Sequence, residues 1–455
     1  MARFLLPDEI SGNWRTLGYN KLFRLSEQDF DLYDLSQVSC VHAASGGREK
    51  FASVFDRFEL DPAGRLVMYA RGGITRYLLE RQNAEVLQKS GTGNSRDPQV
   101  IFEVFWRYFQ ENYAFFKLRG LDWMEIYGTY RPRIHAQTSP EELEEVLTAI
   151  LVSLNDSHAT LLIDGREIST RKPHALVKQW QKEFHSTEFL SLYPQGIPRL
   201  CAHLNETLLS GEGKWALDRQ ILWGWLEPGV GYLAPFSLMD VFGGFEQLHF
   251  GGFEVANVDY LERLRLAMDQ VVNDLSSARL LVVDMRFNLG GHDAAGFVIA
   301  GHFTEQRRLA LTKQAVCLPT GNQLALDSTA LTPAQEIYLE PLGARCYNGP
   351  LAVLTSPATA SAAEVCLYGL LALPQAVLLG EPSRGVLSDM LLMSLPNGWR
   401  TSLSNEIYKA CDGICYEGQG IRPHIAIPVF RTADFYEGLK APVEQALTWM
   451  NQRRL

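Results

Sequence analysis

The stretch at residues 349–364, GPLAVLTSPATASAAE, places a short apolar run directly before a polar loop and a run of small residues. The apolar part, Leu351–Leu354, is bounded by a Gly-Pro pair and by Thr-Ser-Pro, as expected of a strand that is covered on both faces. The small residues and the Leu/Val spacing of the following TASAAEVCLYGLL predict a helix that begins between Thr359 and Ser361. The chain is therefore expected to contain a buried strand that leads through a tight loop into a helix.

Ser361 lies where this predicted helix begins. The first N–H groups of a helix have no partner within the helix and carry its positive end, so a developing oxyanion would be stabilised there. This favours Ser361 as a nucleophile. The alternative is that Thr359 or Ser361 only caps the helix.

The same alternation of strand and helix continues from residue 229 to the end of the chain. GVGYLAPF, ARLLVVDMRFNLGG, LAVLT and AVLLG have the pattern of buried strands, and VDYLERLRLAMDQVVNDL and DAAGFVIAGHF that of helices. A hairpin is expected around the Pro-Asn-Gly at 396–398. Residues 226–455 are therefore predicted to form one α/β domain.

The first half of the chain has a different pattern. Residues 1–90 contain short alternating segments separated by Gly, Pro and Asp, which predicts a β-rich N-terminal domain. A Gly/Ser-rich stretch, SGTGNSRD, then precedes a helical segment at 97–225, in which SPEELEEVLTAILVSL opens on a helix-start signal. The aromatic residues of VIFEVFWRYFQENYAFF are expected to form a core. The predicted fold class is thus multidomain α+β.

Composition narrows the classes of partner. The net charge is −10 and no Lys/Arg-rich block occurs, so nucleic acid is not an expected partner. The sequence contains no run of about 18 apolar residues, so no membrane span is predicted. The N-terminus carries no secretion signal, so the default expectation is the cytoplasm, with the periplasm or secretion if a signal was removed. The seven cysteines form no CxxC pair and are expected to be free, although Cys411 and Cys415 could pair in an oxidising compartment.

Four motifs carry a resemblance to a known family. They are DSH at 156–158, VVDMRFNLGG at 282–291, TASAAE at 359–364 and GEPSRG at 380–385. Their order and spacing resemble the tail-specific (C-terminal-processing) serine peptidase family, with its relatives the tricorn core protease and the retinoid-binding protein modules. The resemblance covers about 225–430 and the segment that bears the histidine. It implies that the C-terminal domain is of the crotonase/ClpP-like spiral kind.

The resemblance also implies a catalytic apparatus. In the Ser-Lys branch of the family the base is a lysine in a GKG segment, but here GEPSRGVLSD has Val386 at that place. The tricorn-like branch uses Ser-His-Ser-Glu. On that basis Ser361 would be the nucleophile and His158 the general base, with Ser157 holding the imidazole and Glu406 orienting Ser157.

The same resemblance implies an oxyanion hole made of two backbone N–H groups. One would come from Gly290, with Gly291 as the alternate, and the other from Ala362. The alternative is an ordinary strand-to-helix turn. Asp284 and Arg286 beside this turn are expected to pair structurally. No HExxH, Cys/His cluster, GxGxxG or P-loop occurs, so no metal and no cofactor is expected.

These observations predict a serine peptidase that hydrolyses peptides or unfolded protein segments through an acyl-enzyme. Two alternatives remain at this point: a non-catalytic protein that binds apolar ligands, like the retinoid-binding modules, and another serine hydrolase on the same fold. A binding module has no reason to bring Ser361, His158 and Ser157 together. No PDZ-like module is evident at 166–225, so specificity for C-terminal tails is not expected.

Overall fold

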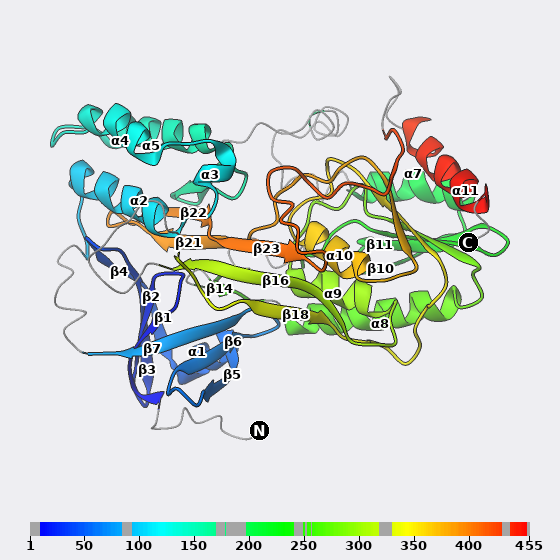
Figure 1. Cartoon of the computed structure of the whole chain (residues 1–455), viewed down its shortest axis with the longest axis horizontal. Helices are drawn as coiled ribbons and strands as arrows, with labels where there is room; N and C mark the ends of the chain where they lie inside the picture. Colours follow the sequence, from blue (N-terminus) through cyan, green and yellow to red (C-terminus); the bar gives the residue numbers. More distant parts are fainter. Residues whose placement is uncertain are drawn as a thin grey trace.

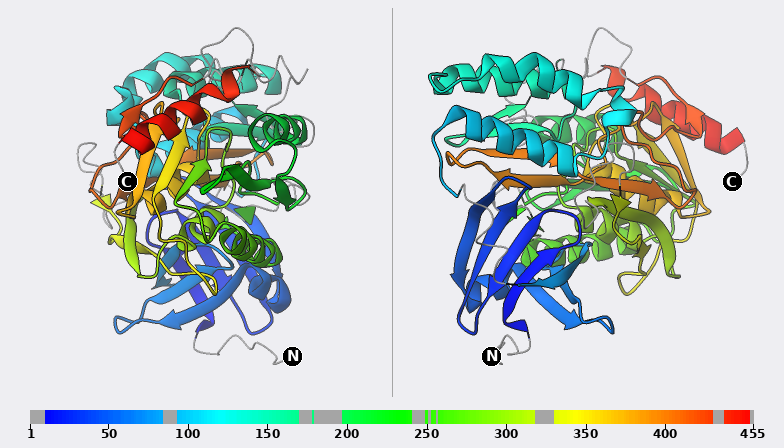
Figure 2. Two further views of the ribbon diagram at one scale, coloured as in Figure 1. Left: turned by 90° about the vertical axis from the view of Figure 1, so that its right-hand side faces the viewer. Right: turned by 60° about the vertical axis from the view of Figure 1, so that its left-hand side comes forward.

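An N-terminal β half-barrel, a helical segment and a C-terminal α/β domain with a mixed sheet make up the protein (Figure 1). The computed structural model describes residues 10–83, 93–169, 178, 197–240, 249–250, 253–255, 257–317, 330–429 and 437–452. The views in Figure 2 show the helical segment (cyan) and the N-terminal sheet (blue) on opposite sides of the strands near residues 390–410, which are drawn in orange.

The N-terminal sheet has seven antiparallel strands in the spatial order β4-β3-β2-β1-β7-β6-β5. Alternate residues of its strands point to one buried face, where aromatic side chains such as Trp14, Phe23 and Tyr77 pack with aliphatic ones. The elements are β1 (Gly12–Thr16), β2 (Lys21–Leu25), β3 (Asp29–Leu35), β4 (Cys40–Gly47), α1 (Arg48–Val54), β5 (Phe55–Leu60), β6 (Leu66–Ala70) and β7 (Arg76–Gln82). The β-rich character predicted for this part of the chain is confirmed.

The helical segment consists of α2 (Pro98–Asn112), α3 (Phe116–Arg119), α4 (Trp123–Tyr130), the 3-10 turn η3 (Arg131–Arg133) and α5 (Pro140–Leu154). Helix α5 begins as predicted, because Ser139 and Glu142 form a reciprocal capping box before Pro140. The aromatic residues of α2 are core residues, as predicted. Trp106, for example, is 2% exposed and stacks on Trp123 with ring centroids 3.9 Å apart.

The central sheet of the C-terminal domain has the order β10-β11-β12-β15-β19-β20-β24, and it is parallel from β12 onward. Its strands are β10 (Lys214–Ala216), β11 (Ile221–Glu227), β12 (Val230–Pro235), β15 (Leu280–Asp284), β19 (Leu351–Thr355), β20 (Ala376–Gly380) and β24 (Ile425–Ala426). The helices of this domain are α7 (Ile197–Leu209), α8 (Val258–Asp274), α9 (Asp293–Gly301), α10 (Ala362–Leu371) and α11 (Ala441–Gln452), with the 3-10 turn η6 (Glu437–Leu439). The strands and helices predicted after residue 229 are confirmed.

Three smaller sheets connect the parts of the molecule. In the first, β16 (Arg308–Cys317) pairs with β17 (Ala330–Leu331), β18 (Gln335–Leu339) and β23 (Glu406–Ala410). The second has the order β21-β22-β8-β9, from β8 (Thr160–Ile163), β9 (Arg166–Ser169), β21 (Met390–Ser394) and β22 (Arg400–Ser404). The third is the hairpin of β13 (His249–Phe250) and β14 (Phe253–Glu254). The pairing of β8 with β22 joins the segment after α5 to the C-terminal domain.

The expected unit boundaries remain proposals. Residue 225, the expected end of the helical segment, lies within β11 of the central sheet. The Trp-rich stretch at 214–226 supplies β10 and most of β11. Within the same predicted segment, residues 177–184 lie outside the described residues except for residue 178.

The tip of the β1–β2 hairpin docks on the C-terminal domain. A Cβ on Gly18 would lie 3.0 Å from the side chains of Ala315 and Thr332, so the tip is in close contact with β16 and its neighbour β17. Tyr19 and Asn20 follow with φ of 62° and 49°, which makes the turn tight. The half-barrel therefore touches the C-terminal domain through specific side chains.

Glu111 on α2 predicts a pH-dependent stability. Its carboxylate is 1% exposed and accepts hydrogen bonds from Asn20 Nδ2 at 2.8 Å and Gln37 N at 2.9 Å. Burial raises the pKa of Glu111 to about 7, so the folded protein holds this proton at pH values where the unfolded chain has lost it. The stabilisation that this proton gives is fully present below the ordinary glutamate pKa. As the pH rises toward 7 it is lost, and the free energy of unfolding falls by up to about 3 kcal/mol.

We expect the melting temperature of the native protein relative to that of Glu111→Gln to fall between pH 5 and pH 8. Comparing the two proteins at each pH cancels titrations elsewhere in the chain. A constant difference across this range would contradict the prediction.

Candidate active site

Ser361 lies at the end of the loop between β19 and α10, at the N-cap position of α10. Its backbone has φ 55° and ψ −130°, a conformation that residues other than glycine rarely adopt. Such strain is found where a side chain must be presented at a sharp turn between strand and helix. The side chain is partly exposed, whereas its neighbours Ala360 and Ala362 are buried.

The Ser361 loop is bound to the turn that follows β15. Ser356 Oγ donates to Arg286 O at 2.6 Å, and Thr359 Oγ1 donates to Met285 O at 2.9 Å. The hydroxyl of Thr359, one of the two expected capping groups, is thus used to join the two loops. Ala360 N donates to Asn288 O at 3.2 Å, which is a third hydrogen bond from the Ser361 loop to this turn.

Glu364, one turn into α10, holds the opposite side of the loop. Its carboxylate accepts from Gly385 N at 2.7 Å, from Val386 N at 2.8 Å and from Ser361 N at 3.3 Å. It is fully buried, and burial raises its pKa above the ordinary value, while these hydrogen bonds act in the other direction. Glu364 therefore joins the strained serine to the segment at 383–386, consistent with a structural role.

The turn at Gly290 and Gly291 packs directly against Ser361. A Cβ on Gly290 would lie 2.8 Å from Ser361 Cβ and 3.1 Å from Ala362 N. Gly290 N donates to Asn288 Oδ1 at 2.9 Å, so this amide already has a partner. Ala362, whose N–H is near this turn, is the first residue of α10.

Asp284 and Arg286 form the structural pair expected from the sequence. Arg286 Nη2 lies 2.6 Å from Asp284 Oδ2, and both side chains are fully buried. Arg286 also donates to Leu439 O at 3.0 Å, while Tyr232 donates to Asp284 Oδ2 at 2.8 Å. This pair fixes the turn after β15 rather than facing a substrate.

His158 lies in the turn between α5 and β8. The helix ends at Asn155 in the left-handed conformation, and Asp156 Oδ1 accepts from His158 N at 2.9 Å. The imidazole Nδ1 lies 2.5 Å from Ser388 O. A carbonyl can only accept, so Nδ1 carries the proton and Nε2 is the basic nitrogen of the neutral ring.

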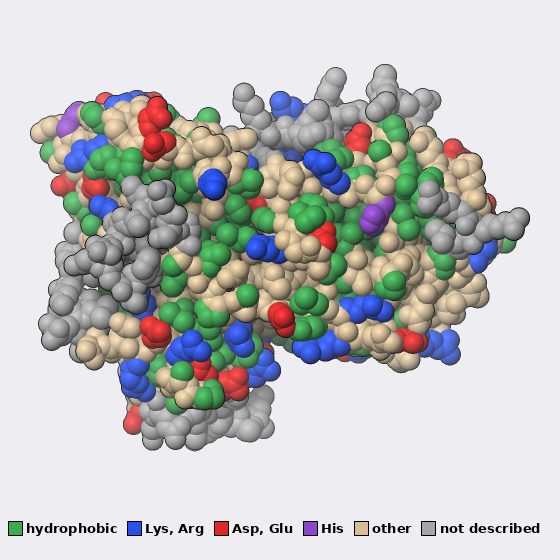
Figure 3. Space-filling model, viewed as in Figure 1, with side chains coloured by type: hydrophobic (Ala, Val, Ile, Leu, Met, Phe, Trp, Pro, Cys, Tyr) green, Lys and Arg blue, Asp and Glu red, His purple; other side chains and the backbone are tan. Residues whose placement is uncertain are grey.

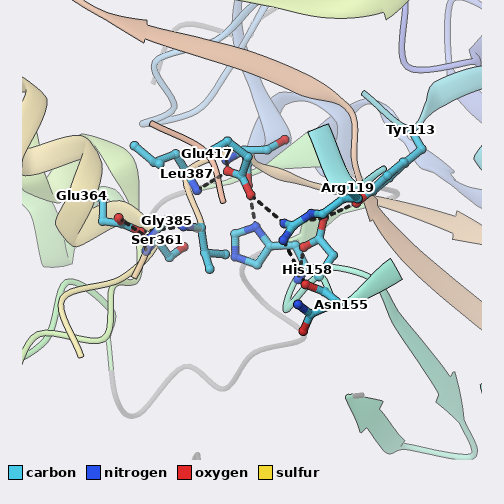
Figure 4. Close-up of polar contacts among 12 residues, drawn as sticks. Tyr113, Arg119, Asn155, His158, Ser361, Glu364, Gly385, Leu387 and Glu417 are labelled. Carbon is cyan, nitrogen blue, oxygen red and sulfur yellow. Dashed lines mark hydrogen bonds and ion pairs between the residues drawn. The ribbon is translucent and has the colours of Figure 1, made fainter. Parts of the chain in front are cut away.

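Figure 4 shows the imidazole between Ser361 and Arg119, with its second nitrogen on the side of Ser361. A carbonyl that holds Nδ1–H fixes both the tautomer and the orientation of the imidazole. The helical segment and the C-terminal domain thus meet at His158 and Ser388.

Glu417 is a site residue that sequence reasoning missed. It is 1% exposed and its Oε2 accepts from Leu387 N at 2.7 Å and from Ser388 N at 3.2 Å. Arg119 bridges it to Asp156, with Nη2 3.2 Å from Glu417 Oε1 and 3.6 Å from Asp156 Oδ2. Burial, together with the charge of Asp156, raises the pKa of Glu417 to about 8. The sequence signal that could have found it is its context YEGQGI at 416–421, within the region of resemblance.

Ser157 and Glu406, the other two expected members of the tetrad, lie in different surroundings. Ser157 is partly buried in the same turn as His158. The carboxylate of Glu406 is 1% exposed and accepts from Lys313 Nζ and Tyr408 Oη, each at 3.0 Å, and from Tyr19 Oη. Its backbone N–H donates to Ser388 Oγ at 3.0 Å.

Two family models match this chain. Residues 255–427 match peptidase family S41, and residues 95–151 match the tricorn protease C1 domain. The C-terminal part of the chain therefore carries a peptidase family S41 domain. The first match contains Ser361 and the glycine turn, and the second ends within α5, shortly before His158. This S41 chain is accordingly a serine-type peptidase.

Solved structures share its fold. A peptidase structure from Parabacteroides merdae ATCC 43184 superimposes with a TM-score of 0.58 at 22% identity, covering 78% of this chain and 97% of that one. Mature CPAF gives 0.53 at 13% identity, with 78% and 97% covered. Mature CPAF complexed with lactacystin gives 0.52 at 12% identity, with 78% and 98% covered. At these identities the likeness concerns the fold.

Within the described residues of this S41 peptidase, no group of three or more His, Cys, Asp or Glu side chains is arranged to hold a metal ion. The described helices also include none with the length and apolar character of a membrane span. On the face in Figure 3, acidic and basic side chains are interspersed with apolar ones. The absence of a nucleic-acid partner and of a cofactor remains a prediction from the sequence.

Proposed function

We propose that this S41 peptidase cleaves peptides or unfolded protein segments with Ser361 as nucleophile and His158 as general base. The observation that carries the proposal is the held imidazole: Ser388 O fixes Nδ1–H and leaves Nε2 on the side of a serine in a strained turn. Ser361 Oγ would attack the scissile carbonyl carbon while its proton passes to His158 Nε2.

The oxyanion of the resulting tetrahedral intermediate would accept hydrogen bonds from Ala362 N and from the glycine turn, with Gly291 N favoured over Gly290 N because the latter is bound to Asn288. The imidazolium would then give its proton to the leaving amine as the C–N bond breaks. Water, deprotonated by His158, would hydrolyse the ester and restore Ser361.

Ser157 and Glu406 remain the other two proposed members of a Ser-His-Ser-Glu tetrad like that of the tricorn-like branch, with the carboxylate of Glu406 bound to Lys313, Tyr408 and Tyr19. The contacts of Glu406 give it a route to the histidine through its backbone N–H and Ser388. The buried network of Glu417, Arg119 and Asp156 supports the histidine turn from the other side. We further propose that the C-terminal domain follows the crotonase/ClpP-like spiral and that substrate binds in extended form, through main-chain hydrogen bonds.

Another acyl-transfer hydrolase would need the same nucleophile and the same oxyanion hole, so an ester substrate is the second candidate. The test is labelling of the intact protein with a fluorophosphonate probe, followed by peptide mapping of the adduct. We expect the label on Ser361, and an excess of a peptide substrate should slow the labelling. A folded protein that is never labelled, or is labelled elsewhere, would refute the proposal.

A further inference from the structure

Ser388 is held from three sides at the centre of the candidate site. It is 1% exposed. Its N–H donates to Glu417 Oε2 at 3.2 Å, its Oγ accepts from Glu406 N at 3.0 Å, and its carbonyl oxygen lies 2.5 Å from His158 Nδ1. The carbonyl that fixes the imidazole thus belongs to a residue whose own position is set by two separate glutamates.

Glu406 is in turn fixed by the N-terminal half-barrel. Tyr19 Oη donates to one of its carboxylate oxygens, and Lys313 Nζ donates to the other at 3.0 Å. Lys313 also donates to Thr75 Oγ1 at 2.5 Å. Tyr19 and Thr75 both come from turns of the half-barrel, and these side chains are all at most 5% exposed. Buried polar groups of this kind are costly unless all are satisfied, so the contact has a defined geometry.

The contacts form a continuous path from one domain to the site. It runs from Tyr19 to the carboxylate of Glu406, from the backbone N–H of Glu406 to Ser388 Oγ, and from Ser388 O to His158 Nδ1. Tyr19 has little freedom to move because the hairpin tip is packed against β16 at Gly18. The half-barrel therefore sits where it can determine the orientation of the imidazole without touching substrate.

We propose that Ser388 is a positioning residue for His158, and that the N-terminal half-barrel fixes it through Tyr19 and Glu406. This inference rests on the proposed function, since it assigns a task within the same site. It gives the half-barrel a role in catalysis: a protein in which the hairpin tip is displaced would keep Ser361 but lose the alignment of its base.

The test compares Ser388→Ala and Tyr19→Phe with two matched controls. In Ser39→Ala a fully buried serine loses its hydrogen bond to Ser36, and in Tyr108→Phe a fully buried tyrosine loses its hydrogen bond to Ser394 O, so each control loses a similar interaction away from His158. We expect kcat to fall about a hundredfold in Ser388→Ala and about tenfold in Tyr19→Phe, because small misplacements of a catalytic group are costly. KM should change little, and the controls should retain the native kcat.

A second measurement does not depend on turnover. An imidazole N–H held at 2.5 Å from a carbonyl should give a low-field proton resonance, which His158→Gln would assign by its loss. We expect this resonance in the native protein and both controls, and its shift or loss in Ser388→Ala and Tyr19→Phe.

Native kcat and an unchanged resonance in the two test variants would overturn the inference and leave the proposed function intact. If Ser388→Ala does not fold, Tyr19→Phe against Tyr108→Phe decides the matter. A native protein without hydrolase activity would refute the proposed function instead, and the resonance would still report whether Ser388 and Tyr19 fix the ring.

Discussion

Ser361→Ala and His158→Ala are each expected to lower kcat/KM for a peptide substrate by about five orders of magnitude. Val386 stands where the Ser-Lys branch of the family has its lysine base, so the proposed acceptor of the Ser361 proton is His158. Members of such a unit are not additive: once the nucleophile is lost, removing the base costs almost nothing further. The double variant should therefore be no slower than either single variant.

The measurement is kcat/KM for the three variants, with circular dichroism to confirm that each is folded. His135→Ala, which changes an exposed histidine outside the candidate site, serves as the control and should retain full activity. Strict additivity in the double variant would show that the two residues act independently. Substantial hydrolysis by Ser361→Ala would assign the chemistry to another group.

The local elements of the site could be predicted because their signals are local. Gly-Pro and Thr-Ser-Pro bound the strand Leu351–Thr355, and the run of small residues predicts the helix that begins at Ala362. The capping box of Ser139 and Glu142 marked the start of α5 in the same way. Each of these signals lies within a few residues of the feature that it predicts, so one sequence is sufficient.

The support of the histidine could not be predicted, because its parts come together only through tertiary structure. Ser388 O lies beside His158 Nδ1 although the residues are 230 positions apart. The antiparallel pairing of β8 with β22 brings these two parts of the chain together. Tyr19 and Glu406 are 387 positions apart and meet because a hairpin tip docks on β16.

The choice between two glutamates shows the same limit. Both Glu406 and Glu417 follow Ser361 within the region of resemblance, and their sequence contexts did not distinguish the groups that they contact. In the fold, Glu417 binds the amides of Leu387 and Ser388, whereas the carboxylate of Glu406 faces Lys313 and two tyrosines. Burial and partner identity are properties of the packed molecule, so they had to come from the structure.

Gly290→Ala is expected to lower kcat by about two to three orders of magnitude, the cost of a lost oxyanion donor. Gly290 has φ +106°, and an added Cβ would lie 2.7 Å from Ala360 O and 2.8 Å from Ser361 Cβ. Both neighbours belong to the nucleophile loop, whose hydrogen bonds to residues 285–288 leave it little room to shift. The glycine turn would have to move away from Ser361, and its amides would move with it.

Gly64→Ala separates this effect from backbone strain. Gly64 also has positive φ, +75°, but no atom lies within 4 Å of an added Cβ, so this variant carries the conformational cost of roughly 1 kcal/mol without the steric clash. It should lose some stability and no activity. We expect Gly290→Ala to keep KM close to the native value, because the oxyanion contact strengthens only as charge develops on the substrate oxygen. A folded Gly290→Ala protein with native kcat would mean that the glycine turn only fixes the Ser361 loop. The N–H donors of the oxyanion hole would then lie elsewhere around Ser361.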